Sequence, residues 1–184
     1  MWDDATFASS LSAQALSSIA EDLAMHRLIM LLSAIALVAG ADELIWVEGE
    51  AFDHGQDAPH PWYSKAIDSE QLSGGAFASS FTKKGPAQIG YDLPVPAAGD
   101  YALWLRANPT KATLQWRLDG GAWQQVDFSR AGDRVNIAKD GKPDLRYLAW
   151  VQAGTADLRP GRHRLDIRFA SKNQSHGSLD CFVL

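Results

Sequence analysis

The chain has 184 residues, of which 46% are hydrophobic and 21% charged, and its formal net charge is −5. This composition is typical of a globular domain with enough apolar material for one core, and it lacks the basic excess of a nucleic-acid-binding surface. Seven tryptophans, 15 glycines and 8 prolines favour an all-β protein with many turns, or a surface that recognises ligands through aromatic rings.

The N-terminal part of the chain has the pattern of a secretory signal peptide. A short positive stretch precedes an apolar run of 11 residues from Leu28 to Val38, and small residues follow up to Ala41. We therefore expect a signal at residues 25–41, and we expect residues 1–24 to be a mis-assigned extension upstream of the true start. Because the apolar run is too short to cross a membrane comfortably, the mature chain is expected to be secreted, periplasmic or at the cell surface, without a membrane span.

The mature region, residues 42–184, is expected to fold as one domain made of short strands. Its alternating apolar residues and its Gly and Pro turns predict an antiparallel β-sandwich of jelly-roll type. We expect a long irregular stretch over residues 51–75 and a polar loop that ends near Pro143. The expected strands are residues 44–48, 87–93, 101–107, 112–118, 123–128, 145–152, 162–170 and 178–184.

Alternation also indicates which side chains face the core. Trp150 is expected on the opposite side of its strand from Val151, outside the core. The single cysteine, Cys181, excludes an internal disulfide, and its alternation with Leu179 and Val183 predicts a buried, inert thiol on their face. In the three clearest strands the inward residues are expected to be Ile89, Tyr91 and Leu93, then Tyr101, Leu103 and Leu105, then Leu114, Trp116 and Leu118.

Two glutamates follow the first apolar run, in the sequence WVEGE. Glu48 and Glu50 are two residues apart, so in an extended strand their carboxylates point to the same side and repel unless something offsets the charge. Three interpretations follow: a solvated edge, a cation site, or the catalytic pair of a glycosidase. Because a glycosidase needs its two carboxyl groups on either side of the scissile bond, neighbours on one strand are a poor catalytic pair.

A longer pattern resembles a known family. The run YDLPVPAAGDYALWLRA is similar to the core of family 6 and family 35 carbohydrate-binding modules, which are galactose-binding-like β-sandwiches. The resemblance extends to LSGGAFASSF before this run and to LDGG, RPGRHRLDIRF and GSLDCFVL after it. It covers most of residues 44–184 in the right order, and it implies a domain that binds carbohydrate without catalysis.

The resemblance also implies a structural calcium ion. In these modules an early Glu-x-Glu strand and an aspartate in the last strand hold calcium, and the matching positions here are Glu48, Glu50 and Asp180. Calcium takes six to eight hard oxygen ligands, which three carboxylates, water and backbone carbonyls from the loop around Gly74 and Gly75 would supply. Such an ion would relieve the repulsion between the glutamates and tie the first strand to the last.

In such modules the sugar is bound by aromatic rings and polar groups on loops at one end of the sandwich. The resemblance points to Trp62 and Tyr63 in the long first loop as stacking platforms, and the alternative is that these rings seal the end of the core. Trp150 either faces the binding cleft or covers the outside of its sheet. The family often has an asparagine two residues before the final aspartate; this chain has Ser178 there, and His176 is the nearest substitute.

These observations predict a secreted, non-catalytic module that binds a polysaccharide or glycan and contains a structural calcium. Such a module would keep fused or associated catalytic domains near their substrate. The first alternative is a structural or adhesion module of the same fold without a sugar site. The second is a small glycan hydrolase, which is disfavoured because the sequence contains no recognisable catalytic set. No nucleic-acid partner is expected.

Overall fold

The computed structural model of the chain describes residues 44–60, 65–81, 85–108, 112–170 and 177–184. These residues belong to one structural unit, Glu43–Leu184. The predicted signal peptide and the extension before it lie outside the described residues. No helix in the described part of the chain is long and apolar enough to span a membrane.

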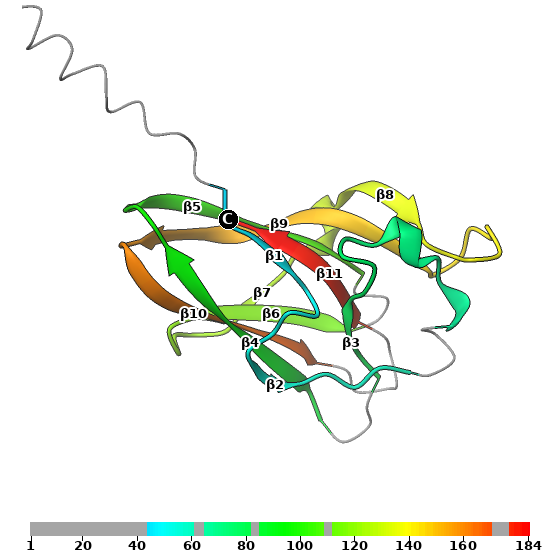
Figure 1. Cartoon of the computed structure of the whole chain (residues 1–184), viewed down its shortest axis with the longest axis horizontal. Coiled ribbons are helices and arrows are strands. Elements are labelled where there is room, and N and C mark those ends of the chain that lie inside the picture. The colour runs from blue at the N-terminus through cyan, green and yellow to red at the C-terminus, as the bar shows by residue number, and fades with distance from the viewer. Residues whose placement is uncertain (1–43, 61–64, 82–84, 109–111, 171–176) are drawn as a thin grey trace, which may run out of the picture. The chain divides into compact units, whose positions relative to one another are not determined.

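Two antiparallel sheets make up the domain (Figure 1). The first has the strand order β1-β11-β5-β9-β8, with β3 also paired to β11; its strands are β1 Trp46–Glu48, β3 Ala78–Ser80, β5 Gly99–Asn108, β8 Gly132–Asn136, β9 Tyr147–Leu158 and β11 Gly177–Val183. The second has the order β2-β4-β10-β6-β7; its strands are β2 His54–Gln56, β4 Ala87–Val95, β6 Thr113–Leu118, β7 Gln124–Gln125 and β10 Gly161–Ala170. Two short 3₁₀ helices, η1 Ser69–Gln71 and η2 Phe128–Arg130, lie between strands. The predicted all-β antiparallel sandwich is confirmed.

The core forms where the inner faces of the two sheets meet. Seven of the nine side chains predicted to face inward are at most 1% exposed: Ile89, Tyr91, Leu93, Leu103, Leu105, Leu114 and Trp116. The other two, Tyr101 and Leu118, are half-buried and pack against the same cluster. Alternation identified the inner face because every second residue of a strand points to the same side of the sheet.

A β-bulge in β11 changes the alternation of the last strand. Leu179 pairs with Ala107 and Cys181 pairs with the very next residue of β5, Arg106, so one residue of β11 is inserted between them. As a result Leu179 and Phe182 both belong to the core. The expectation that Cys181 shares a face with Leu179 was wrong, because the bulge reverses the direction of the side chains that follow it.

The sulfur of Cys181 is buried, as predicted. Burial, and then the charge of Asp180, raise the pKa of this thiol to about 12. The thiol is therefore protonated at neutral pH, and a protonated buried thiol is a poor nucleophile.

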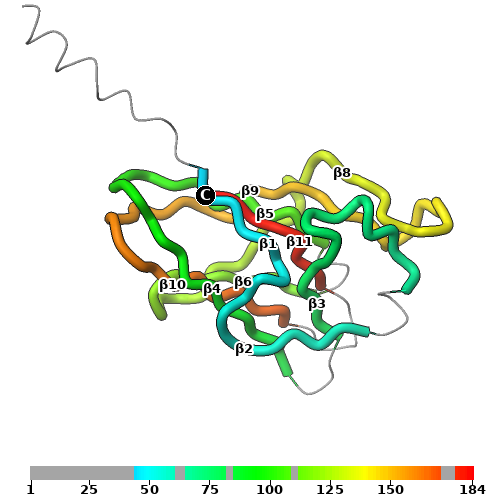
Figure 2. Tube along the Cα trace, in the orientation of Figure 1, coloured from blue at the N-terminus to red at the C-terminus, as the bar shows by residue number. Residues whose placement is uncertain are grey.

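Several short or polar elements were not expected. Strand β8 lies inside the segment predicted as a polar loop. Its sequence GDRVN contains one apolar residue because, among the described strands, it is an exposed edge strand paired with β9 alone. Strand β2 and helix η1 lie in the stretch predicted as irregular. Strand β9 is longer than expected and continues to Leu158. Figure 2 shows β1 and β11 side by side near the C-terminus, where their pairing joins the first described strand to the last.

The bulge makes a direct prediction about core stability. Phe182 is fully buried and its ring lies 4.8 Å from that of Tyr91, whereas its neighbour Val183 is only half-buried and lies outside the core. Phe182→Ala should lower the free energy of unfolding by about 3–5 kcal/mol in urea denaturation, and Val183→Ala by about 1 kcal/mol or less. Equal losses for the two variants would contradict the side-chain directions that follow the bulge.

Candidate functional site

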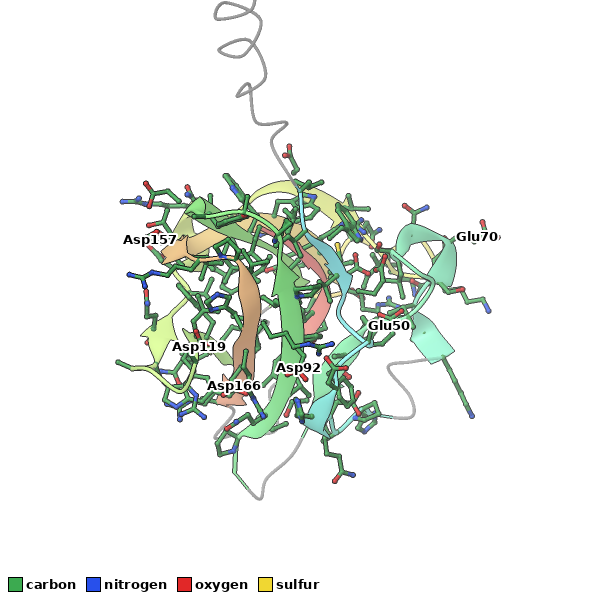
Figure 3. The ribbon with its side chains drawn as sticks, turned by 60° about the vertical axis from the view of Figure 1, so that its left-hand side comes forward. Glu50, Glu70, Asp92, Asp119, Asp157 and Asp166 are labelled. Carbon is green, nitrogen blue, oxygen red and sulfur yellow. The ribbon has the colours of Figure 1, made fainter. Side chains whose placement is uncertain are left out.

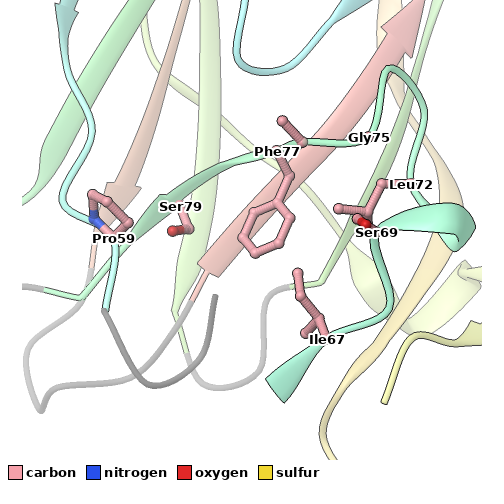
Figure 4. Close-up of a pocket in the computed structure, with 8 residues that line it drawn as sticks. Pro59, Ile67, Ser69, Leu72, Gly75, Phe77 and Ser79 are labelled. Carbon is pink, nitrogen blue, oxygen red and sulfur yellow. The ribbon is translucent and has the colours of Figure 1, made fainter. Parts of the chain in front are cut away.

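The segment from residue 65 to residue 77 is fastened to strands β8 and β9. Ile67 and the buried side chains of Ile137 and Leu148 form a second, smaller apolar cluster, against which Leu72 and Phe77 pack. Part of this segment lines a small, mostly apolar hollow (Figure 4), whose residues are Pro59, Ile67, Ser69, Leu72, Gly75, Ala76, Phe77 and Ser79. These apolar contacts hold residues 65–77 against β9 and the residues that follow β8.

Hydrogen bonds and ion pairs also hold this segment in place. The Asp68 amide donates to the Ile137 carbonyl at 2.8 Å, and the Lys139 amide donates to the Ala66 carbonyl at 3.0 Å. Arg146, which is 8% exposed, donates to the Ala66 carbonyl and forms ion pairs with two aspartates that follow β8, Asp140 and Asp144. Residues 65–77, which include η1, are therefore held in a defined position on the outer face of the first sheet.

Four residues from distant parts of the chain form a hydrogen-bonded network, here called the bulge network: Glu48, Ser73, Arg106 and Asp180. Asp180 is the residue inserted at the bulge, and its side chain is completely buried. Its Oδ2 accepts from Arg106 Nη1 at 2.6 Å and its Oδ1 from the Ser73 amide at 3.0 Å. The Ser73 hydroxyl donates to Glu48 Oε1 at 2.8 Å, so the network connects β1, the segment after η1, β5 and β11.

Burial shifts the ionisation of Asp180, and its partners in the bulge network oppose that shift. Burial raises the pKa of this carboxyl, and the charge and hydrogen bond of Arg106 oppose the increase. Because an unpaired buried charge is costly, Arg106 and the Ser73 amide are what allow a carboxylate to occupy this position.

Glu48 and Glu50 converge on Gly74. A Cβ at Gly74 would lie 2.8 Å from Glu50 Oε1 and 3.4 Å from Glu48 Cδ, and the residue has a φ of +60°. Only glycine meets both conditions without strain. Figure 3 shows Glu50 near the segment that carries Glu70, while Asp92 and Asp166 lie on strands of the second sheet.

The two glutamates present oxygens that fit a cation. Glu48 Oε2 and Glu50 Oε2 are buried and accept no hydrogen bond from any described residue. Buried carboxylate oxygens are normally paired, and a hard cation is a suitable partner for two of them. The Gly49 carbonyl between them accepts a hydrogen bond from the buried Tyr91 hydroxyl at 2.6 Å; burial, and then the charge of Glu50, raise the pKa of Tyr91 above its usual range.

The third predicted metal ligand is arranged differently. The carboxylate of Asp180 faces Arg106 and the Ser73 amide, and its backbone carbonyl accepts from the Gly49 amide at 2.7 Å. Across residues 44–60, 65–81, 85–108, 112–170 and 177–184, no group of three or more His, Cys, Asp or Glu side chains is arranged to hold a metal ion. The calcium set of Glu48, Glu50 and Asp180 stays a prediction, and the donor chemistry fits best at the two glutamates.

A groove next to the bulge network, here called the tryptophan groove, crosses the outer face of the first sheet. It is lined by Trp46, Glu70, Gln71, Leu72, Ser73, Arg106, Asp133, Val135 and Trp150. Trp46 and Trp150 meet edge to face, with ring centroids 5.9 Å apart. Trp46 Nε1 also donates to Glu48 Oε1 at 2.9 Å, so a hydrogen bond and a ring contact both restrain the Trp46 side chain. The groove thus combines two adjoining aromatic rings with a polar rim.

Cross-strand pairing explains how these side chains meet. Arg106 lies opposite Trp150 on one side and opposite Cys181 on the other, and Cys181 lies opposite Glu48. Directly opposed residues share a face of the sheet, so all four belong to the outer face. Trp104, two residues before Arg106 in β5, lies on this face outside the groove and is 40% exposed.

The predicted ligand-binding residues divide into two groups. Trp62, Tyr63 and His176 lie outside the described residues. Trp150 is half-buried, outside the core, in the tryptophan groove. Sequence reasoning did not select Trp46 or Arg106 for this site. The signal that could have found them is the alternation of side chains along a strand. Trp46 is two residues from Glu48 and so points to the same side, and Arg106 follows the inward Leu105 and so points outward.

Comparisons with known proteins support the fold. No protein-family model and no curated protein matches the chain. A family 35 carbohydrate-binding module from an environmental isolate has 14% identity and a TM-score of 0.52, over 76% of this chain and 92% of that module. The GH26-CBM35 β-(1,4)-mannanase of Podospora anserina has 18% identity and a TM-score of 0.50, over 78% of this chain and 27% of that chain.

A third structure gives the same result. The exo-β-1,3-galactanase of Phanerochaete chrysosporium, solved with galactose, has 14% identity and a TM-score of 0.50, over 78% of this chain and 30% of that chain. This chain therefore spans less than a third of the mannanase and galactanase chains. The comparisons establish that the domain has a fold like that of family 35 carbohydrate-binding modules, and a fold alone does not establish a function.

The buried ion pair of the bulge network is open to a double-mutant test. Arg106→Met should lower the free energy of unfolding at neutral pH by about 3–5 kcal/mol, because it leaves the buried Asp180 charge unpaired. Adding Asp180→Asn should restore at least half of the loss, since the amide keeps an acceptor for the Ser73 amide and carries no charge. The exposed Arg162→Met is the matched control and should cost less than about 0.5 kcal/mol. Strictly additive losses in the double variant would contradict the pairing.

Proposed function

We propose that the chain is a secreted, non-catalytic carbohydrate-binding domain that keeps attached or associated catalytic machinery close to a polysaccharide or glycan. The observation that supports this proposal most directly is the pair of adjoining tryptophans, Trp46 and Trp150, in an open groove on a sandwich of this fold. An aromatic ring packs on the C–H face of a sugar, and a few polar side chains beside it set orientation by hydrogen bonding.

The polar residues of the groove suit this task. Gln71 has an exposed side chain that offers both a donor and an acceptor, and Ser73 brings a polar side chain to the same wall. Because Trp46 is held by Glu48 and Trp150, little side-chain entropy would be lost on binding. Trp62, Tyr63 and His176 complete the proposed sugar-contacting set.

A binding role without catalysis agrees with the contacts of Glu48 and Asp180, the two acids of the bulge network. Glu48 accepts hydrogen bonds from Trp46 and Ser73, and Asp180 is paired with Arg106. Glycoside hydrolysis requires two carboxyl groups that flank the scissile bond, one of them able to donate a proton. Acids committed to these structural contacts are poorly suited to that chemistry.

We further propose that calcium binds at Glu48 and Glu50, with carbonyl oxygens of the surrounding loop and Asp180 as the remaining candidates. When bound, the ion would neutralise the two adjacent carboxylates and satisfy their unpaired buried oxygens. These carboxylates lie between β1 and the loop that contains Gly74, so binding would stabilise the wall of the tryptophan groove.

Glycan binding is predicted to depend on Trp150 and not on Trp104. A glycan array should identify a ligand, and its affinity should fall at least tenfold in Trp150→Ala because a stacking surface is lost. Trp104→Ala removes an equally large, exposed ring from the same sheet face outside the groove, and it should bind normally. Equal losses in both variants, or no binding to any glycan by the parent domain, would contradict the proposal.

Calcium is predicted to stabilise the folded domain. Saturation at a hundred times the dissociation constant would add about 2.7 kcal/mol, which calorimetry would detect as a higher melting temperature than in chelator. Glu50→Gln should abolish this increase, while the exposed Asp157→Asn, with the same change of charge, should retain it. An unchanged melting temperature for the parent domain, or an equal increase in Glu50→Gln, would rule out calcium at this position.

A further inference from the structure

The charges around the tryptophan groove are unevenly distributed. Glu70 from η1 and Asp133 from β8 line the groove and are solvent-exposed. Arg106 is the one basic residue among the described groove residues, and its guanidinium is 2.6 Å from the fully buried carboxylate of Asp180. The positive charge is therefore neutralised within the protein, whereas the two exposed carboxylates remain available to a ligand.

A second feature of the groove favours a cation. The negative face of a tryptophan ring attracts an ammonium group, and this attraction adds to that of nearby carboxylates. Trp46 and Trp150 bring two such rings into the groove. An anionic ligand would meet the opposite situation, because its carboxylate or sulfate would face Glu70 and Asp133 without a free basic partner in the groove.

From this charge complementarity we infer that the tryptophan groove binds glycans that carry protonated amino groups, such as polymers of unacetylated amino sugars, and excludes polyuronates. This inference rests on the proposed carbohydrate-binding function and specifies its ligand class. The sugar rings pack against Trp46 and Trp150, and the ammonium groups lie toward Asp133 and Glu70. N-acetylation removes the charge and leaves the rest of the sugar intact, so it isolates the electrostatic part of recognition.

The test is isothermal titration calorimetry of the whole domain at mildly acidic pH, where sugar amines are protonated. Glucosamine oligosaccharides are compared with N-acetylglucosamine oligosaccharides of the same length and with galacturonate oligosaccharides. The amine form should bind about tenfold more tightly than the acetylated form, and galacturonate should not bind measurably. High ionic strength should reduce the preference, because exposed charges are screened.

Two variants separate groove charge from overall charge. Asp133→Asn should reduce the preference for the amine form over the acetylated form about threefold or more. Asp100→Asn is the matched control. Asp100 is an exposed acid at the start of β5, whereas the groove residue Arg106 lies near the end of that strand, so this variant should keep the preference.

The outcomes distinguish this inference from the function on which it rests. Binding of acetylated or uronate oligosaccharides as tight as that of the amine form, or a preference that Asp133→Asn leaves unchanged, would overturn the amine specificity while carbohydrate binding stands. Failure of the domain to bind any of these oligosaccharides and any glycan on an array would overturn both.

Discussion

A carboxylate that is buried inside a β-bulge is the constraint on which the rest of the outer face depends. Asp180 is inserted into the last strand, has no solvent exposure and needs partners for both oxygens. Arg106 from the neighbouring strand and the Ser73 amide supply them. Because the bulge also reverses the side-chain directions of β11, Phe182 packs in the core while Cys181 turns to the outer face beside Arg106.

The partners of Asp180 determine the shape of the groove. Arg106 also donates to the Gln71 carbonyl at 3.1 Å, and Ser73 bonds to Glu48, which in turn accepts from the Trp46 indole. One continuous chain of polar contacts therefore runs from the buried carboxylate to the tryptophan that lines the groove. The apolar cluster around Ile67 also holds residues 65–77, the segment that contains Gln71 and Ser73. Substitutions in this network should therefore affect both stability and ligand binding.

The sequence predicted the sandwich well because most of the strands that make its core alternate between inward apolar and outward polar residues. Ile89, Tyr91 and Leu93 fall on the inner face, and no knowledge of partner strands was needed to place them. Strand β8 was missed because an exposed edge strand needs few apolar residues. The bulge was missed because it depends on the register between β11 and β5, which local alternation does not contain.

The candidate site was only partly predictable for the same reason. Glu48 and Glu50 were recognisable as near neighbours from their spacing. Trp150 was recognisable as an outer-face residue because it alternates with the inward Val151. The pairing of Asp180 with Arg106 joins positions 74 residues apart, and only the assembled sheet brings them together. Trp46 carried a usable signal, since it shares a face with Glu48 in the same strand.

The central claim is that the tryptophan groove is the ligand-binding surface and that the bulge network holds it in place. The most direct measurement is an NMR titration of the indole N–H signals of the domain's tryptophans with glucosamine oligosaccharides. The signals of Trp46, whose N–H donates to Glu48, and of Trp150 should shift with one common dissociation constant, while those of Trp104 and the buried Trp116 should stay in place. Unchanged Trp46 and Trp150 signals in a titration that shifts Trp104 or Trp116 would contradict it.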